Sequence, residues 1–437
     1  MAGASTLETM SPQLSKVVER ARREPEGQFH ALAHLIDVPA LVRAYRRMRK
    51  DAAVGVDGVT KEQYGQDLEA NLRDLHERLV SMRYRHQPIR RVHIPKVSGK
   101  ARPIGISTFQ DKLVQDAVRE VLEAIYEQDF LDCSYGFRPG RRAHDAVRTL
   151  DRIVHRGEVQ WILEADIASF FDSVDRKMLL KMLQTRVADG SLLRLIGKCL
   201  HVGVLDGAEF SEPQTGTVQG SVLSPLLGNV YLHYVLDLWF EREVKPRLRG
   251  KATLIRYCDD YLITFEREDD ARRVQAVLGK RMERFGLTLH PDKTRLLPFG
   301  KPPASSSKGP ATFDFLGFSF YWKRARSGRW GMACKTRSAS LRRAIKSVYD
   351  WCRSHRHQPV KAQHLALCRR LQGHFNYFGV SGNYRSLLLV FEEAKRSWFK
   401  WLCRRSQRKR LTWERYAAML SRLPLPRPRI TVRIWGT

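Results

Sequence analysis

The sequence predicts an α+β protein whose C-terminal part is helical and basic. Stretches with strand character alternate with helical stretches between residues 90 and 320, and the pattern from about residue 336 onward is helical. Strands that alternate with helices, followed by a run of helices alone, are typical of an α+β core joined to a helical module. At 437 residues the chain is long enough for roughly two or three domains.

The positive charge is concentrated near the C-terminal end. The formal net charge is +31, and residues 323–437 hold 28 Lys and Arg against 4 Asp and Glu, a balance of +24. Residues 1–322 hold 49 against 42, a balance of +7. A basic surface that served solubility alone would spread the excess more evenly. The concentration favours a polyanionic partner, of which nucleic acid is the commonest, or an acidic surface.

Other features exclude several classes of protein. The seven cysteines stand alone with no CxxC pair, which argues against a zinc ribbon or finger and favours a reducing compartment. The N-terminal stretch is polar and lacks the apolar core of a signal peptide. The most apolar stretch, "VLSPLLGNVYLHYVLDLWF", contains Pro225, Asn229, His233 and Asp237, so we expect no membrane span. We therefore expect a soluble, intracellular protein.

Local patterns predict the elements in chain order. Helices are expected within 12–50, a loop at 54–60, a charged helix over 61–82, a hairpin of strands 88–96 and 101–106, and a helix over 111–128 with one apolar face. A strand within 161–174 leads to a helix from about Arg176, capped by Asp172 or Ser173. Further expectations are a helix over 222–243, strands around 253–265, a helix over 268–287, a hairpin-like region at 312–322, and helices after 336.

Two adjacent carboxylates interrupt an apolar strand pattern in "TLIRYCDDYLITF". Asp is depleted in strands, and a buried carboxylate must be paired or hold a cation. Successive strand residues face opposite sides of a sheet, so Asp259 and Asp260 can serve one site only at a hairpin tip. An ordinary turn, where Asp is common, is the alternative. Asp166, at the end of the apolar strand in "WILEADIASFFDSV", supplies a third carboxylate, although a helix cap or a surface strand end would explain it alone.

Three strand-borne aspartates suit a site for hard divalent cations. Mg²⁺ is held by one or two carboxylates together with substrate phosphates. Two such ions about 4 Å apart stabilise the attacking and leaving oxygens of an in-line phosphoryl displacement. With the polyanion-binding charge, the carboxylates predict a nucleotidyl-transfer enzyme that uses two Mg²⁺ ions, with Mn²⁺ able to substitute.

Several motifs, in order and spacing, resemble a bacterial group II intron-encoded reverse transcriptase and maturase of the endonuclease-lacking type. "RYCDDYLITF" resembles the Tyr-x-Asp-Asp signature with Cys258 at x, and "ADIASFFDSV" resembles the first metal-binding motif. "TGTVQGSVLSPLLGNVYL" resembles the Thr-Pro-Gln-Gly motif with Val218 in place of Pro. "CSYGFRPGRRAHDAV", "GLTLHPDKT" and "FDFLGFSF" also match, and the likeness covers roughly residues 40–430.

The resemblance implies a right-hand polymerase, with fingers and palm carrying an antiparallel sheet, followed by an α-helical thumb and maturase domain. Residues 1–87 would form an N-terminal helical extension of the fingers, 88–322 the fingers and palm, and 323–437 the basic thumb and maturase domain. Larger relatives continue with a DNA-binding segment and an endonuclease that has paired cysteines. No such pairs occur here, so we expect no nicking of a target strand.

The resemblance also implies residue roles, which the chemistry supports. Asp166, Asp259 and Asp260 would be catalytic and bind metal, with the Ile167 carbonyl as a further oxygen ligand. Lys96, Arg102, Phe171 and Gln219 would bind the nucleotide, and Lys293 and Gly317 would line the primer–template side. Arg suits a bidentate phosphate clamp and Lys a point charge. Taken alone, the same residues would fit a solvated basic hairpin (Lys96, Arg102), a core aromatic (Phe171) and a turn (Gln219).

Basic and aromatic residues alternate in the C-terminal helical part, for example in "EEAKRSWFKWLCRRSQRKR". Such interleaving suits a groove that binds a nucleic-acid backbone and stacks bases. The helical spacing of Trp398, Trp401 and Leu402 equally suits the core of a helix bundle. The resemblance implies that this region holds the template–primer duplex and a structured intron RNA.

The resemblance thus implies an RNA-directed DNA polymerase that extends a DNA or RNA primer with deoxynucleotides on an RNA template and assists intron splicing and mobility. It also implies a location in the bacterial cytosol or nucleoid. One alternative is a domesticated enzyme of the same type that serves DNA repair or phage defence. A second is a non-catalytic RNA-binding splicing cofactor, against which the intact set of three aspartates argues.

Overall fold

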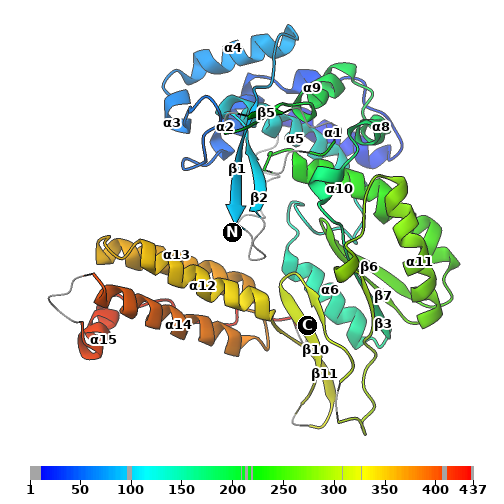
Figure 1. Ribbon diagram of the computed structural model, residues 1–437. Helices are drawn as coiled ribbons and strands as arrows, with labels where there is room; N and C mark the ends of the chain where they lie inside the picture. The colour runs from blue at the N-terminus through cyan, green and yellow to red at the C-terminus, as the bar shows by residue number, and fades with distance from the viewer. Residues whose placement is uncertain are drawn as a thin grey trace. The chain divides into compact units, whose positions relative to one another are not determined.

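The computed structural model describes residues 11–95, 101–207, 209–211, 215–217, 220–307, 309–325, 327–405 and 411–434 (Figure 1). The chain divides into two compact units. The first contains Met1–Ala143, Ala165–Ile263 and Arg267–Leu296, and the second contains His144–Glu164, Thr264–Glu266 and Leu297–Thr437. Helices and sheets occur together, as expected for an α+β protein. None of the helices in the described ranges is both long enough and apolar enough to span a bilayer.

The first unit is built around one long helix. Its N-terminal helices are α1 (Pro12–Arg23), η1 (Ala33–Leu35), α2 (Val38–Arg47), α3 (Lys61–Tyr64), α4 (Leu68–Val80) and α5 (Phe109–Asp129). The apolar face predicted for α5 is confirmed, because Leu113, Ala117, Val121 and Ile125 are all buried. Helices α1 and α2 pack against α5, so this helix is the core of the N-terminal part.

The charged helix expected over 61–82 forms as two helices, and the prediction of one continuous helix is wrong. Thr60 caps α3 by accepting a hydrogen bond from Gln63 N, and the Gln63 side chain accepts one from the Thr60 backbone. Helix α3 then ends at Tyr64, with Gly65 as its C-cap. The Tyr45 hydroxyl of α2 packs so close to Gly65 that a Cβ at this position would displace it.

The hairpin predicted for the following segment is confirmed. Strands β1 (Ile89–Pro95) and β2 (Ala101–Ile106) are antiparallel, with Ile94 opposite Arg102. Strand β1 also pairs in parallel with β4 (Val204–Asp206), which in turn pairs with β5 (Glu209–Ser211).

A second sheet has the strand order β6-β7-β3-β8. Its strands are β3 (Trp161–Asp166), β6 (Ala252–Tyr257), β7 (Asp260–Phe265) and β8 (Arg295–Pro298). The central residues of β3, β6 and β7 are mostly buried, which matches their apolar sequences. This sheet carries the three aspartates singled out in the sequence.

The segment after β3 forms two helices, α7 (Phe170–Ser173) and α8 (Arg176–Gln184). The predicted cap at Asp172 or Ser173 is wrong, because both residues lie inside α7. Val174 then adopts an extended ψ of 123° that interrupts the helix, and Asp175 caps α8 by accepting from Met178 N.

The helix expected over 222–243 changes its winding part of the way along. It starts as α10 (Ser224–Leu232) and continues as the π-helical segments η2 (His233–Asp237) and η3 (Trp239–Val244). The remaining helices of the first unit are α9 (Gly190–Leu200), η4 (Lys245–Arg247), α11 (Glu268–Arg284) and η5 (Pro291–Lys293).

The second unit combines a three-stranded sheet with helices. The sheet has the order β11-β10-β9, from β9 (Phe313–Phe315), β10 (Phe318–Arg324) and β11 (Trp330–Thr336). The helices are α12 (Ser338–Ser354), α13 (Val360–Phe378), α14 (Tyr384–Cys403) and α15 (Trp413–Arg422), together with most of α6 (Ala143–His155).

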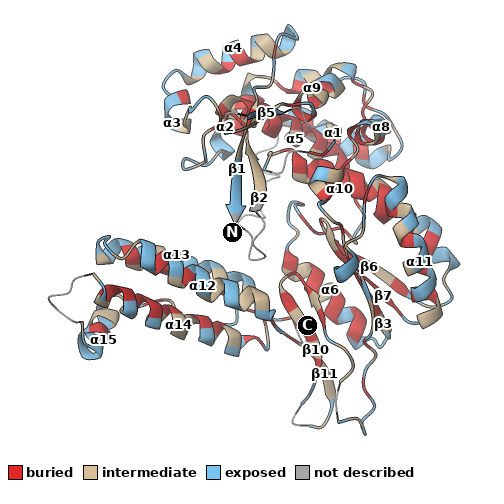
Figure 2. Cartoon of the chain, viewed as in Figure 1, coloured by how far each residue is buried: buried red, intermediate tan, exposed pale blue. Residues whose placement is uncertain are grey.

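The aromatic residues of this helical part supply its core. Trp398, Trp401 and Leu402 are buried in one cluster with residues of α12 and α13, so the bundle-core interpretation of their spacing is confirmed. The Trp398 indole N–H also donates to Gln363 Oε1 at 3.0 Å. Buried and exposed positions alternate along α12, α13 and α14 (Figure 2). The basic residues therefore occupy faces that the aromatic core leaves outside.

Candidate active site

The two adjacent aspartates lie at a hairpin tip, as strand alternation required. Strand β6 ends at Tyr257 and β7 begins at Asp260, so Cys258 and Asp259 form the connecting turn. We call Tyr257–Asp260 the β6–β7 turn. Asp259 and Asp260 are both partly exposed at this tip, whereas the strand residues behind them are buried. Both carboxylates are therefore accessible at the tip, outside the buried part of the sheet.

Cys258 gives the turn its shape. It is a non-glycine residue in the left-handed region, with φ of +58°, and it is 2% exposed. Burial, reinforced by the negative charge of Asp259, raises the pKa of the Cys258 thiol to about 12. At neutral pH the side chain is thus a small neutral group packed under the turn, as expected of a buried free cysteine.

Gly136 lies directly against this turn. A Cβ at Gly136 would lie 2.6 Å from Cys258 N and 2.9 Å from the Tyr257 carbonyl carbon. The neighbouring backbone runs along β6, because Tyr135 N donates to the Arg256 carbonyl and Arg256 N donates to the Cys133 carbonyl, both at 2.8 Å. The glycine of "CSYGFRPG" therefore has a packing reason, namely close approach of two backbones.

Asp166 ends β3, and its carboxylate pairs with a lysine far away in the chain. Lys293 Nζ lies 2.6 Å from Asp166 Oδ2. Backbone pairing brings them together: Ala168 N donates to the Thr288 carbonyl and His290 N donates to the Asp166 carbonyl, each at 2.8 Å. Lys293 therefore contacts a predicted metal ligand directly, a contact that the sequence did not indicate.

The end of β3 lies beside the start of β7. These strands are neighbours in the sheet, and the negative charge of Asp166 acts on Tyr261, the residue after Asp260. Burial, and secondarily this charge, raises the pKa of Tyr261. Within the described part of the chain, the buried Tyr261 hydroxyl has no hydrogen-bond partner. The carboxylates of β3 and of the β6–β7 turn thus share one end of the sheet, next to an unsatisfied buried hydroxyl.

Phe171 lies against residues 215–217, which include Gly216. Its ring is partly exposed and packs 5.2 Å from the buried ring of Phe170. Thr217 N donates to the Phe171 carbonyl at 2.6 Å. After the loop, a Cβ at Gly220 would lie 2.6 Å from the Gly105 carbonyl oxygen of β2. The residues that flank the predicted glutamine therefore contact the Phe171 segment on one side and strand β2 on the other.

Two of the residues predicted to bind the nucleotide, Lys96 and Gln219, lie outside the described residues, as does Val218. Arg102 lies on β2, the strand that Gly220 approaches. Ile167 is buried directly after Asp166 and pairs with Leu289 in an isolated bridge.

Gly317 belongs to the second unit, where the local backbone conformation explains why the residue is glycine. It follows Leu316 in the turn between β9 and β10, and both residues have positive φ, +52° for Leu316 and +78° for Gly317. The Gly317 carbonyl accepts from Arg337 N at 2.9 Å. The tight hairpin therefore explains this glycine without a ligand.

Sequence reasoning missed the residues beneath the turn. Arg256 and Asp237 are fully buried and form an ion pair at 2.5 Å. Asn229, also buried, accepts from Arg256 NH1 at 2.9 Å. The available signal was a set of polar residues in otherwise apolar segments, since a buried charge requires a partner. Asn229 and Asp237 served only to exclude a membrane span.

The carboxylates fit a site for a divalent cation of the Mg²⁺ type in which substrate oxygens supply the remaining ligands. Over the ranges that the structure describes, no group of three or more His, Cys, Asp and Glu side chains is arranged to hold a metal ion by itself. A site made of one or two carboxylates plus substrate phosphates does not require such a group. Oxygen ligands on two adjacent strand ends, beside the unsatisfied Tyr261 hydroxyl, match that chemistry.

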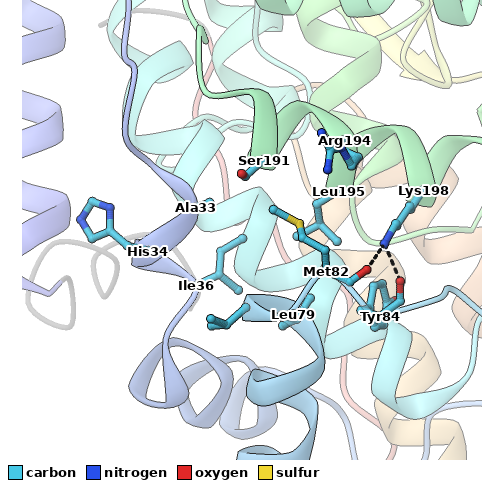
Figure 3. Close-up of a pocket in the computed structure, with 11 residues that line it drawn as sticks. Ala33, His34, Ile36, Leu79, Met82, Tyr84, Ser191, Arg194, Leu195 and Lys198 are labelled. Carbon is cyan, nitrogen blue, oxygen red and sulfur yellow. Dashed lines mark hydrogen bonds between the residues drawn. The ribbon is translucent and has the colours of Figure 1, made fainter.

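A separate cavity of about 260 Å³ lies in the first unit (Figure 3). It is lined by Ala33, His34, Ile36, Leu79, Val80, Met82, Tyr84, Ser191, Arg194, Leu195 and Lys198. Lys198 donates to the carbonyls of Met82 and Tyr84 at 3.0 and 2.6 Å, so its charge is directed at backbone. None of the site residues predicted from the sequence lines this cavity.

Comparison with known proteins agrees with the motifs. Residues 94–320 match the model of the reverse transcriptase (RNA-dependent DNA polymerase) family. Protein YkfC of Escherichia coli K12 is 30% identical over 73% of this chain and 90% of its own length. The group II intron-encoded protein LtrA of Lactococcus lactis subsp. cremoris is 36% identical over 52% of this chain, but only 40% of LtrA is covered.

A third relative is the mitochondrial nuclear intron maturase 1 of Arabidopsis thaliana, 36% identical over 21% of this chain and 13% of its own length. The family model spans more than half of the chain, and YkfC is matched over nearly its whole length. The chain therefore belongs to the reverse transcriptase (RNA-dependent DNA polymerase) family and is of the group II intron reverse transcriptase/maturase type.

Proposed function

We propose that this protein is an active RNA-directed DNA polymerase that extends a primer 3′-hydroxyl with deoxynucleotides on an RNA template. The observation that carries the proposal is the shared position of Asp166 at the end of β3 and of Asp259 and Asp260 in the β6–β7 turn. Family membership supplies the reaction class, and the carboxylates supply the ligands that the reaction needs.

In this reaction the primer 3′-hydroxyl attacks the α-phosphate of the nucleotide, and pyrophosphate leaves. A pair of Mg²⁺ ions supplies charge stabilisation for the attacking and leaving oxygens when bound. Asp166 and Asp259 would hold these ions, with Asp260 and the Ile167 carbonyl as further oxygens. The remaining work is orientation of the substrate, which can contribute a large part of the rate enhancement.

The nucleotide would lie between β2 and Phe171. Arg102 and Lys96 would contact the triphosphate, Gln219 would contact the nucleotide, and the Phe171 ring would pack against the sugar and favour deoxynucleotides. The contacts of the loop at 215–217 with Phe171, and of Gly220 with β2, support this arrangement because they bracket Gln219. Lys293, already paired with Asp166, would line the primer–template side of the site.

We further propose the right-hand arrangement, with residues 88–322 as fingers and palm, 1–87 as a helical extension and 323–437 as thumb and maturase domain. The charge of +24 over 323–437, together with the buried position of the Trp398 and Trp401 core, supports an RNA-binding surface made of basic residues. Intron RNA would be bound mainly through its backbone and shape.

Primer extension with a DNA primer on an RNA template tests the catalytic proposal. Asp259→Ala and Asp166→Asn are expected to abolish extension, and Asp51→Asn serves as a control because the Asp51 carboxylate is 74% exposed and pairs only with Arg49 among the ion pairs of the described residues. Extension by either site variant at the wild-type rate would refute the mechanism. A wild-type protein that binds RNA but never extends a primer would favour the non-catalytic splicing cofactor.

Sequencing of the RNA that copurifies with the protein tests the maturase role. The basic helical part and the intron proteins among the relatives favour a structured intron RNA as the bound species. Recovery of unrelated transcripts in proportion to their abundance would contradict a dedicated intron partner. Absence of intron sequence around the gene would then support the domesticated alternative.

A further inference from the structure

A fully buried arginine supports the β6–β7 turn from below. Arg256 is 0% exposed, and its NH1 group donates to the Cys258 carbonyl at 3.2 Å. That carbonyl belongs to the peptide that joins Cys258 to Asp259. Because a peptide unit is planar, the orientation of this carbonyl fixes the direction in which the Asp259 backbone leaves the turn.

All five N–H groups of the Arg256 guanidinium are used. Nε donates to Asp237 Oδ1 at 2.7 Å, and NH2 donates to Asp237 Oδ2 at 2.5 Å and to Ser134 Oγ at 2.8 Å. NH1 donates to Asn229 Oδ1 at 2.9 Å and to the Cys258 carbonyl. Only a guanidinium presents five donors in a fixed planar fork, so no other side chain could replace these contacts.

The change from α-helical to π-helical winding places two acceptors of the Arg256 guanidinium, Asn229 and Asp237, on one side of the helix. Asn229 in α10 and Asp237 at the end of η2 are eight residues apart. In an α-helix, with 3.6 residues per turn, residues eight apart point about 80° away from each other. The wider turns of η2 reduce this offset. Both side chains consequently reach the same guanidinium, although they lie more than two turns apart.

The network also holds the backbone on the other side of the turn. Asn229 Nδ2 donates to the Gly136 carbonyl at 2.7 Å while its Oδ1 accepts from Arg256. Gly136 packs against Cys258 N, as described above. Cys258 is thus enclosed between Gly136 and the Arg256 guanidinium, which accounts for a non-glycine residue that keeps a φ of +58°.

We propose that Arg256 is a positioning residue for the polymerase reaction, which it serves by fixing the Cys258–Asp259 peptide and hence the metal-binding direction of Asp259. Asp237 and Asn229 hold the guanidinium in place. This inference rests on the proposed function. Arg256 contacts neither substrate nor metal in this assignment, and its effect is transmitted through one hydrogen bond to the turn.

Arg256→Lys tests the assignment, since lysine keeps the charge opposite Asp237 but cannot reach all four partners. We expect primer extension to fall about tenfold to a hundredfold in kcat, as for small misplacements of a catalytic group. The affinity for primer–template, measured by fluorescence anisotropy, should stay unchanged. The affinity for Mn²⁺, measured by electron paramagnetic resonance titration without substrates, should weaken several-fold.

Arg186→Lys is a matched control in the same unit. Arg186 is similarly buried, with a side chain 4% exposed, pairs with Asp129 at 2.8 Å and also donates to several backbone carbonyls. None of its hydrogen bonds or ion pairs to described residues reaches the turn. Both variants should lose thermal stability, yet Arg186→Lys should keep the wild-type kcat and Mn²⁺ affinity. If Arg256→Lys folds poorly, Asn229→Ala is a second test. It removes one partner of the Arg256 guanidinium without leaving a buried charge unpaired.

The outcomes separate the two levels of the proposal. Wild-type kcat and Mn²⁺ affinity in folded Arg256→Lys and Asn229→Ala would overturn the positioning role, as would equal losses of kcat in Arg256→Lys and Arg186→Lys. A wild-type protein without polymerase activity would instead refute the proposed function. In that case weaker Mn²⁺ binding by Arg256→Lys alone would still support the effect of Arg256 on the turn.

Discussion

The Lys293 ammonium group lies 2.6 Å from Asp166 Oδ2, across 127 residues of sequence. The lysine side chain is 54% exposed and the aspartate side chain 26%, so the pair lies at the surface of the site. Such a pair contributes about 0–1 kcal/mol to stability. Its importance is therefore electrostatic, because the ammonium neutralises a carboxylate that the proposed mechanism assigns to a metal ion.

Replacement of this lysine by an uncharged residue should increase the affinity for divalent cations. In Lys293→Met the Asp166 carboxylate loses its cationic partner, and Mg²⁺ no longer competes with an ammonium group. We expect Mg²⁺ to raise the melting temperature of Lys293→Met more than that of the wild type, because ligand binding stabilises the folded state. An equal or smaller Mg²⁺-dependent shift would show that Lys293 does not compete with the cation.

The close approach of Gly136 to Cys258 predicts a sharp effect of one added methyl group. Gly136→Ala should destabilise the protein by about 1–3 kcal/mol and strongly reduce primer extension, since the Cβ would displace the turn. Gly279→Ala is the control, because Gly279 lies within α11 and a Cβ there meets no atom within 4 Å. That control should be more stable by about 0.5–1 kcal/mol in urea unfolding and fully active. Wild-type extension by Gly136→Ala would contradict the packing account.

Buried His233 predicts a loss of stability in acid. Burial lowers its pKa to about 4 from the usual 6.5, so the folded state keeps the ring neutral while the unfolded state binds a proton below pH 6.5. The stability that the neutral His233 ring contributes is fully present above pH 6.5. It is lost as the pH falls towards 4, by about 3 kcal/mol in all. His233→Leu should flatten this part of the stability profile measured by denaturant unfolding. An unchanged slope between pH 6.5 and 4 would rule out His233 as the cause.

The bundle-core position of Trp398 predicts that it acts on stability more than on RNA affinity. Trp398→Ala should destabilise the second unit by about 3–5 kcal/mol, because it removes a fully buried side chain and its hydrogen bond to Gln363. Trp413 is 54% exposed and stacks on Phe399 at 4.0 Å, so Trp413→Ala should cost less than about 1 kcal/mol. Thermal unfolding compares the two. Equally small losses of stability in the two variants would make Trp398 a candidate for RNA contact instead.

The parts of the fold that could be predicted from sequence are those with a local signal. The hairpin of β1 and β2 follows from strand alternation around a turn, and the buried face of α5 follows from helical spacing. The tip position of Asp259 and Asp260 follows from the same alternation, because two neighbours in a flat strand cannot share a face.

The parts that escaped prediction depend on contacts between distant residues. Strands β4 and β5 have three residues each, too short for a periodic signal, and β4 is held by parallel pairing with β1. The Lys293–Asp166 pair depends on the pairing of residues 288–290 with the end of β3. The helix breaks before Asp175 because Val174 has an extended backbone. The residue types around Asp172 gave no sign of this break.

The completeness of the Arg256 network has a consequence for how such sequences can change over time. Loss of Arg256 or Asp237 alone leaves the other charge buried and unpaired, at a cost of about 3–5 kcal/mol. That amounts to a large share of the total stability of a typical domain. Replacement of both by apolar residues avoids this cost but releases the Cys258 carbonyl. Descendants of this chain are therefore expected to keep the pair together or to lose it together, and loss of the pair should accompany loss of polymerase activity.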